Sequence, residues 1–183
     1  MDPELVDRIY ESSLVPELWP GVLYEVGRIA EAGGSLFIIN ADVTFWTASP
    51  IVHQAAAKFV KEGWFWRGQL AARSFAARHA GFLTDLDLLT PDELDLEPIY
   101  CDFWRSLGVG WAVATAIPIS TGENVLFTLT RRIERGPVER AVVQKLDELR
   151  PHLARSALLS ARLQLERARA TSARRSRPPG AGS

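Results

Sequence analysis

Hydrophobic and polar positions along this chain follow two different periods. Apolar residues recur every three or four positions over residues 5–12 and 17–32, which predicts two amphipathic helices. The period then shortens to that of a strand over residues 35–40 and 43–48, and the polar turn between these runs predicts a β-hairpin. We expect the pair Gly33–Gly34 to end the second helix, because glycine readily closes a helix C-terminus.

The middle of the chain returns to helical patterns. Residues 51–63 have an alanine-rich face that predicts a helix, and residues 64–85 read as a loop and a helix followed by a short strand. Thr90 lies three residues before Glu93, with a proline directly after Thr90. This spacing is that of a capping box and predicts the start of a further helix.

Two strands and a long helix complete the pattern. Residues 109–119 and 123–132 are apolar runs joined by a glycine-containing turn, which predicts two more strands. A helix begins at Pro137 and continues to about Ala170, with Pro151 as a possible kink. This order of elements is typical of an α+β domain with a central antiparallel sheet of about five strands, flanking helices and a long C-terminal helix.

The run at residues 109–117 is apolar on both of its faces. Large side chains alternate with small ones, and the small set consists of Gly110, Ala112, Ala114 and Ala116. Such a strand is covered on both sides. The small face lets a helix approach closely, whereas the large face packs a core or lines a cavity for a small molecule. Both interpretations of the large face stay open.

Length and composition describe one globular domain of 183 residues, 47% of them hydrophobic, with a net charge of −1. The charge is unevenly distributed. Residues 84–102 carry acidic and no basic side chains, and we expect them to form a solvated helix face. Residues 162–177 carry arginines against Glu166 alone. We expect residues 1–170 to fold as one domain and residues 171–183 to form a basic, disordered linker.

The sequence argues against several classes of function. No apolar run is long enough to cross a bilayer, and no signal-peptide pattern is present, so we expect a cytoplasmic protein without a membrane partner. The single Cys101 excludes an intramolecular disulfide, and its acidic neighbours do not suit a nucleophilic thiolate. The 3 histidines lack metal-ligand spacing. We predict no metal, no other cofactor and no enzymatic activity.

Aromatic residues gather around the segment "GWFWRG" at residues 63–68. Glycines at both of its ends predict a loop folded against the sheet. Aromatic walls with a few polar groups are typical of a ligand pocket, and equally of an ordinary packed lid. In a pocket, Arg67 would pair with an anionic ligand group and Thr115 would form a hydrogen bond. The predicted ligand-binding residues are Trp64, Trp66, Arg67, Phe103, Trp104, Trp111 and Thr115.

The last helix has an apolar surface wider than one stripe. One set of residues predicts the side that packs on the domain: Val142, Leu146, Leu149, Leu153 and Ala157. Further leucines widen this surface, as a second copy of the helix in a short coiled coil would require. The alternative is a helix that covers only its own sheet. From Leu159 onward we expect an overhang of about 18 Å at ~1.5 Å per residue. The predicted dimer-interface residues are Leu153, Leu159 and Leu163.

Several motifs together resemble those of one family. They are "IYESSLVPELWPGVL" near the start, "GFLTDLDLLTPDEL" and "PIYCDFWRSLGVG" in the middle, and "FTLTRR" and "GPVERAVVQKLDELRPHLARSALLSARL" toward the end. From about Leu5 to Ala168 the chain is similar to the N-terminal sensor domain of LuxR-type, helix-turn-helix transcriptional regulators. The resemblance implies a GAF/PAS-like sensor fold, a role in transcription regulation, and a terminal helix that connects the sensor to a DNA-binding domain.

One departure from this family is that no DNA-binding domain follows before Ser183. The motif "LTPDEL" at residues 89–94 resembles the opening of a helix-turn-helix, but its acidic surroundings suit no DNA groove. The leading hypothesis is a homodimeric sensor domain for an unknown small-molecule signal, either cut from a longer regulator or a natural truncation, with DNA bound only through a domain missing from this chain. The alternatives are a ligand-free dimerisation or adaptor module and a small-molecule enzyme on the same scaffold.

Overall fold

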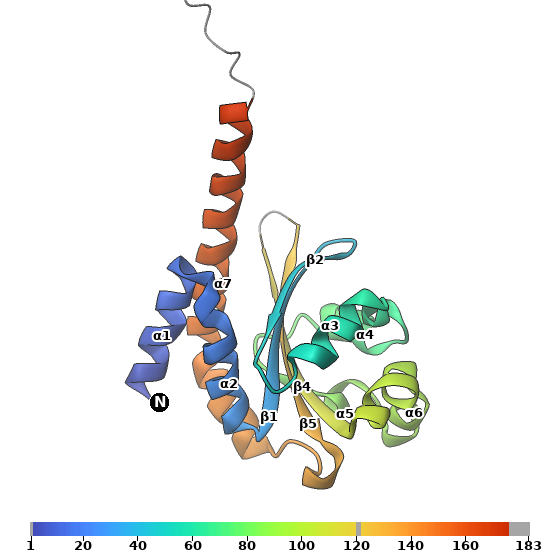
Figure 1. The fold of residues 1–183 in the computed structure, drawn as a ribbon. Helices are drawn as coiled ribbons and strands as arrows, with labels where there is room; N and C mark the ends of the chain where they lie inside the picture. Colours follow the sequence, from blue (N-terminus) through green and yellow to red (C-terminus); the bar gives the residue numbers. More distant parts are fainter. Residues whose placement is uncertain (1, 120–121, 176–183) are drawn as a thin grey trace, which may run out of the picture.

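The computed structural model describes residues 2–119 and 122–175, with side chains described as far as Leu163 and at Glu166. Within these residues, a five-stranded antiparallel sheet stands between two layers of helices (Figure 1). The strand order is β2-β1-β5-β4-β3. The predicted α+β class, the antiparallel sheet of five strands and the long C-terminal helix are confirmed.

The strands of the sheet are β1 (Ala32–Ile39), β2 (Val43–Ala48), β3 (Leu83–Thr84), β4 (Val109–Pro118) and β5 (Asn124–Arg132). The first helical layer consists of α1 (Pro3–Leu14), η1 (Pro16–Leu18), α2 (Trp19–Ile29) and α7 (Arg140–Arg175). The second layer consists of α3 (His53–Lys61), η2 (Trp64–Trp66), α4 (Leu70–Ala76), α5 (Asp85–Leu88), α6 (Pro91–Leu96), the π-helical η3 (Ile99–Trp104) and η4 (Arg105–Leu107). The short turn η5 (Ile133–Arg135) connects β5 to α7.

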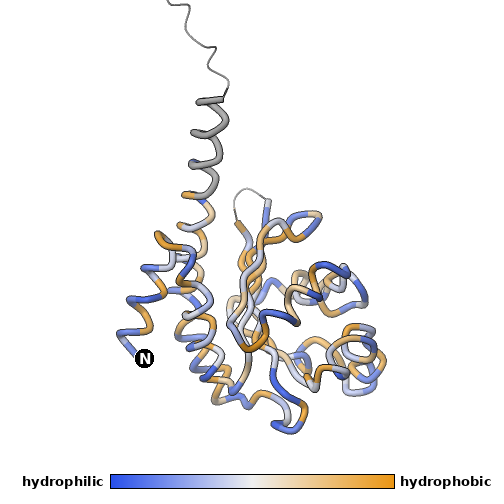
Figure 2. Tube along the Cα trace, viewed as in Figure 1, coloured by the Kyte–Doolittle hydropathy of each residue, from blue (hydrophilic) through white to orange (hydrophobic). Residues whose placement is uncertain are grey.

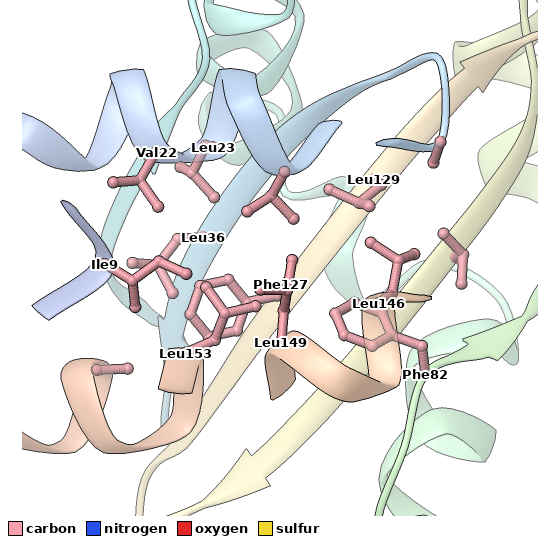
Figure 3. Close-up of a cluster of buried hydrophobic side chains, with 14 of the residues drawn as sticks. Ile9, Val22, Leu23, Leu36, Phe82, Phe127, Leu129, Leu146, Leu149 and Leu153 are labelled. Carbon is pink, nitrogen blue, oxygen red and sulfur yellow. The ribbon is translucent and has the colours of Figure 1, made fainter. Parts of the chain in front are cut away.

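The main hydrophobic core lies between the sheet and the first helical layer. Figure 3 shows Phe127 of β5 facing Leu149 and Leu153 of α7, while Leu23 of α2 lies above the neighbouring strand. Alternate residues of each strand point into this core, as the strand period requires. Figure 2 shows the apolar residues concentrated along the strands, between the two layers. A second, aromatic-rich core lies between the sheet and the second helical layer.

Gly33 and Gly34 lie inside β1 and do not end α2, contrary to the sequence expectation. The reason is the close approach of α2 to the strand. A Cβ atom on Gly34 would collide with the backbone carbonyl of Leu23, and one on Gly33 would collide with the Val52 side chain. The two glycines therefore permit close packing. A glycine pair after an amphipathic pattern is equally typical of a helix C-cap, so the sequence alone does not distinguish the two roles.

The helix α7 is the longest element, with 36 residues. At ~1.5 Å per residue it is about 54 Å long. Its buried side chains extend to Ser160, after which the helix projects beyond the sheet (Figure 1). It continues to Arg175, past the predicted end near Ala170. The remainder of the predicted linker, residues 176–183, lies outside the described residues.

Candidate ligand-binding site

The face of the sheet beneath the second helical layer bounds a partly enclosed cavity. The space that the centres of water molecules can reach is about 80 Å³. The strands β1, β4 and β5 supply its floor: Ser35, Phe37, Ala112, Ala114, Leu126, Thr128 and Thr130. Most of these side chains are small, and the helices above do not fill the space that they leave.

The cavity lies on the small face of β4, where the sequence favoured a closely packed helix. Ala112 and Ala114 line it, whereas Val113 and Ile117 from the large face belong to the main core under α7. A bulge at Gly110 interrupts the alternation, since Val109 pairs with Arg132 and Trp111 with Arg131. Of the two interpretations left open for the large face, the packed core holds for Val113 and Ile117, and the cavity lies on the opposite face.

The roof of the cavity comes from the second helical layer. Phe59 of α3, Phe65 of η2, Leu70 and Ala71 of α4 and Trp104 of η3 are among its lining residues. Phe59 and Trp104 stack with ring centroids 5.4 Å apart. The segment around residues 64–66 thus forms an aromatic lid, and a cavity remains beneath it. Both interpretations of the aromatic cluster, a packed lid and a pocket, describe part of this arrangement.

Two hydroxyl groups on the floor are unpaired. Ser35 of β1 and Thr128 of β5 are register partners across the two strands, and Ser35 is 6% exposed. Neither hydroxyl forms a hydrogen bond with any residue that the structure describes. Thr128 is half-buried, and both residues line the cavity, so each hydroxyl oxygen keeps some accessible surface there. A ligand with a hydroxyl, carbonyl or amide group would supply a partner here.

The wall near β3 carries a buried carboxylate. Asp85 is 3% exposed and accepts hydrogen bonds from the Tyr100 hydroxyl at 2.5 Å and from the Ala112 backbone N–H at 2.8 Å. Burial raises the pKa of Asp85 to about 6, and these two hydrogen bonds oppose the rise. Burial and the adjacent Asp85 raise the pKa of Tyr100 well above its usual value. Asp85 therefore ties η3 to β4 and gives the cavity one acidic wall.

A second buried carboxylate anchors the roof. Glu97 is 4% exposed and accepts the backbone N–H groups of Gln69 at 3.0 Å and Leu70 at 3.4 Å, at the start of α4. Gly68, directly before, has φ +97°, and a Cβ atom there would collide with the Glu97 carboxylate. The expectation that the acidic stretch is a solvated face is wrong for Asp85 and Glu97. Each carboxylate is buried and accepts hydrogen bonds from backbone N–H groups.

Two arginines hold the edges of the roof. Arg73 of α4 donates to the Leu88 carbonyl at 2.9 Å and to the Glu93 carboxylate at 2.8 Å, which joins α4 to α5 and α6. Arg67 donates to the Glu62 carbonyl at 2.8 Å and lies 4.3 Å from the centre of the Trp64 ring. Arg67, predicted as an anion partner, lines the cavity but is already engaged on its outer side.

Of the predicted ligand-binding residues, Arg67 and Trp104 line the cavity. Trp64 and Phe103 pack against each other behind it with ring centroids 5.3 Å apart, and Trp66 is 47% exposed. Trp111 lies outside the lining residues, and its indole N–H donates to the Ile133 carbonyl. Thr115 lies on the opposite face of β4, where it contacts α7.

Sequence reasoning missed Ser35, Asp85, Tyr100 and Thr128 as candidate binding residues. Single hydroxyl residues inside apolar strands carry no pattern that separates a cavity floor from an ordinary core. The one sequence feature that could have located the cavity is the row of small residues on one face of β4, because small side chains leave space between the sheet and the helices.

The predicted dimer residues occupy different environments on α7. Leu153 is fully buried in the core of its own chain, which leaves no surface for a partner. Leu159 is 46% exposed, and Leu163 is half-buried. Exposed apolar side chains also lie where α1 ends and η1 follows, and α1 packs along α7: these are Leu14, Val15 and Leu18.

The part of the chain that comprises residues 2–119 and 122–175 has no group of three or more His, Cys, Asp and Glu side chains placed to hold a metal ion. None of its helices combines the length and apolar character needed to span a bilayer. Cys101 is exposed, and its thiol donates to the Asp95 carbonyl at 2.9 Å.

Two solved structures have folds similar to that of this chain. The ligand-binding domain (LBD) of VqsR from Pseudomonas aeruginosa is similar with a TM-score of 0.65 and 14% identity, covering 88% of this chain and 95% of that one. SdiA from Escherichia coli is similar with a TM-score of 0.53 and 11% identity, over 77% of this chain and 60% of that one. No protein-family model and no curated protein sequence matches this chain. The similarity is therefore one of fold.

Proposed function

We propose that this chain is the signal-sensing domain of a LuxR-type transcriptional regulator and that it binds a small molecule in the cavity. Its fold is similar to that of the VqsR ligand-binding domain, and its motifs resemble the sensor domains of that family. The observation that carries the proposal is the pair of unpaired hydroxyls, Ser35 and Thr128, on the floor of an otherwise largely apolar cavity. The role is one of binding, without catalysis.

The lining supports an uncharged, largely apolar ligand with one polar group. The aromatic roof suits an apolar body, and the two hydroxyls both accept and donate hydrogen bonds. Asp85, ionised at neutral pH, repels an anionic ligand. It favours a ligand that offers a hydrogen-bond donor toward that wall.

Size sets a further condition on the ligand. Pockets that enclose larger organic ligands have volumes of roughly 300–1,000 Å³, against the 80 Å³ that water-molecule centres reach here. A ligand of more than a few heavy atoms therefore requires α4 and η2 to move outward. Because α4 and η2 pack in the second core and not in the main core, this roof can shift without disturbing the main core.

Thermal unfolding in the presence of small alcohols, ketones, esters and amides tests this proposal. Saturating ligand at about 100-fold above its Kd is expected to raise the Tm by roughly 5–10 °C. Thr128→Leu, which fills the cavity, should abolish the shift, and Thr128→Val should weaken it by removing only the hydroxyl. Exposed Thr44→Val is the matched control and should leave the shift intact. A wild-type protein that no compound stabilises, with a filled cavity in its crystal structure, would support a ligand-free adaptor instead.

We further propose that the protein acts in the cytoplasm as a homodimer through the projecting part of α7. The exposed Leu159 and the apolar end of α1 support a second helix at this position. In this arrangement DNA is bound only through a helix-turn-helix domain outside this chain. The angle between paired α7 helices then determines how such domains face DNA.

A further inference from the structure

Residues 81–88, which we call the bridging segment, lie between the cavity and α7. Phe82 and Leu83 are neighbours in this segment, but their side chains lie on opposite sides of the sheet. Phe82 is 1% exposed and packs in the main core near Leu146 (Figure 3). Leu83 lines the cavity. One short segment therefore contacts both the candidate binding site and the layer that contains α7.

On the cavity side, the bridging segment completes one continuous line of residues across the sheet. Ser35 pairs with Thr128, Thr128 with Ala114, and Ala114 with Leu83. We call these four residues the cavity row, and all of them line the cavity. A molecule that rests on this row presses on Leu83 at its end.

On the other side, α7 holds the same segment by side-chain hydrogen bonds. The Asp147 carboxylate accepts the Phe82 backbone N–H at 2.6 Å. The Thr115 hydroxyl donates to the Gly81 carbonyl at 2.8 Å and accepts from Arg150 at 2.7 Å. Asp147 and Arg150 are three residues apart and so share one face of the helix. A Cβ atom on Gly81 would come within 2.8 Å of the Asp147 carboxylate and 2.9 Å of the His79 ring, so these side chains would have to shift.

The strand within the bridging segment has few ladder pairs with the sheet, although the Asp85 carboxylate adds a hydrogen bond from the Ala112 N–H of β4. The edge strand β3 pairs with β4 at only two positions, Leu83 with Ala114 and Thr84 with Val113. A strand with so few ladder contacts can shift while the other four remain paired. The hydrogen bonds from α7 therefore add to the few contacts that fix the position of this strand.

We propose that the bridging segment transmits the state of the cavity to α7. An occupant that displaces Leu83 also moves Phe82, because the two residues are adjacent in one short strand. The Asp147 and Arg150 contacts then change with it. This inference rests on the proposed function, since a signal requires occupied and empty cavities to favour different positions of the segment.

Cavity-filling substitutions test this transmission without any ligand. Ala114→Val adds bulk directly beside Leu83, whereas Ser35→Val adds bulk to the same cavity at the far end of the cavity row. Amide hydrogen exchange of the full chain reports the Phe82 N–H, which donates to Asp147, and the α7 amides of residues 140–150. Ala114→Val should accelerate exchange at Phe82 by about tenfold and alter the α7 amides, while Ser35→Val should change them less than about twofold.

A second pair of variants covers the case in which Ala114→Val does not fold. Leu83→Ala removes the cavity contact of the bridging segment, and Leu126→Ala removes a leucine of the same cavity from β5. Faster exchange at Phe82 in Leu83→Ala alone supports transmission. Equal changes within either pair, or unchanged Phe82 and α7 amides in Ala114→Val and Leu83→Ala, overturn it. Because no ligand is used, a failed ligand search would affect the proposed function and leave this result standing.

Discussion

The Tyr100 hydroxyl donates a hydrogen bond of 2.5 Å to the Asp85 carboxylate inside the cavity wall. Asp85 also accepts the Ala112 backbone N–H, which lies on the edge of β4 beyond its two pairs with β3. The Asp85 side chain thereby accepts a β4 backbone N–H that the two-residue strand β3 is too short to reach. Asp85 is therefore a buried carboxylate, and its titration affects the stability of the fold.

Asp85 should make the folded protein less stable as the pH rises. Burial raises its pKa from 3.8 to about 6, so the folded state holds the proton more tightly than the unfolded chain. The resulting stabilisation is complete below the unfolded pKa and disappears as the pH rises through about 6. Between about pH 4.5 and pH 7.5, wild type should lose about 2 kcal/mol relative to Asp85→Asn. Urea denaturation of both proteins across this range measures the difference.

Asp87 provides a control of opposite sign for that experiment. Partial burial raises its pKa, but hydrogen bonds from Thr84 and the nearby Arg140 outweigh this and leave the pKa lowered. Its stabilisation is therefore present at neutral pH and disappears as the pH falls through the lowered pKa. Asp87→Asn should cost more stability at neutral pH than in acid. If the stability lost in Asp85→Asn and in Asp87→Asn changed with pH in the same direction, the raised pKa assigned to Asp85 would be contradicted.

Gly68→Ala should destabilise the protein more than Gly63→Ala. Both glycines have positive φ, which costs an alanine roughly 1–2 kcal/mol. At Gly68 the new Cβ atom also displaces the Glu97 carboxylate from α4, and the lost hydrogen bonds bring the expected cost to about 3 kcal/mol. Gly63 has open space around it. Chemical denaturation of the two variants measures the costs, and equal values would show that Glu97 does not anchor the roof.

Trp104 should report a bound ligand by fluorescence. Its ring stacks on Phe59 and lines the cavity, so an occupant changes the surroundings of the indole. A compound that raises the Tm should also shift the emission of wild type and of Trp19→Phe, because Trp19 lies in the main core on the other side of the sheet. The shift should be lost in Trp104→Phe. A shift that persists in Trp104→Phe would place the ligand elsewhere.

Leu159→Glu should shift a homodimer toward monomer, because it puts a charge into the exposed apolar part of α7. Sedimentation velocity at about 100 μM protein measures the association. Lys145→Glu, exposed on α7 14 residues before Leu159 and therefore about 21 Å away along the helix axis, is the charge-changing control and should leave association intact. Wild-type protein that sediments only as a monomer would refute the proposed dimer.

The sequence predicted the fold well wherever local chemistry decides local structure. The capping box at the start of α6 is present: the Glu93 N–H donates to the Thr90 hydroxyl at 3.3 Å, and the Thr90 N–H donates to the Glu93 carboxylate at 2.9 Å. The two β-hairpins and the long last helix also follow from period and composition. These features depend on residues close together in sequence.

The site was less predictable because it depends on contacts between distant residues. Asp85 and Tyr100 are 15 positions apart, and Glu97 caps a helix 28 positions earlier, so no local motif connects them. Thr115 was predicted as a pocket residue because of its hydroxyl group. The alternation of side chains along β4 instead places it on the face that packs against α7. The aromatic cluster was located correctly, but most of its rings pack against one another behind the cavity.

The separation of the two cores by a single sheet has a consequence for how such proteins diversify. The cavity-row residues Ser35, Thr128 and Ala114 alternate along their strands with Leu36, Phe127 and Val113, which belong to the main core. Ligand selectivity and the stability of the main core thus depend on different side chains of the same strands. A lineage of this fold can acquire new chemical preferences by a few substitutions on one face, without rebuilding its architecture.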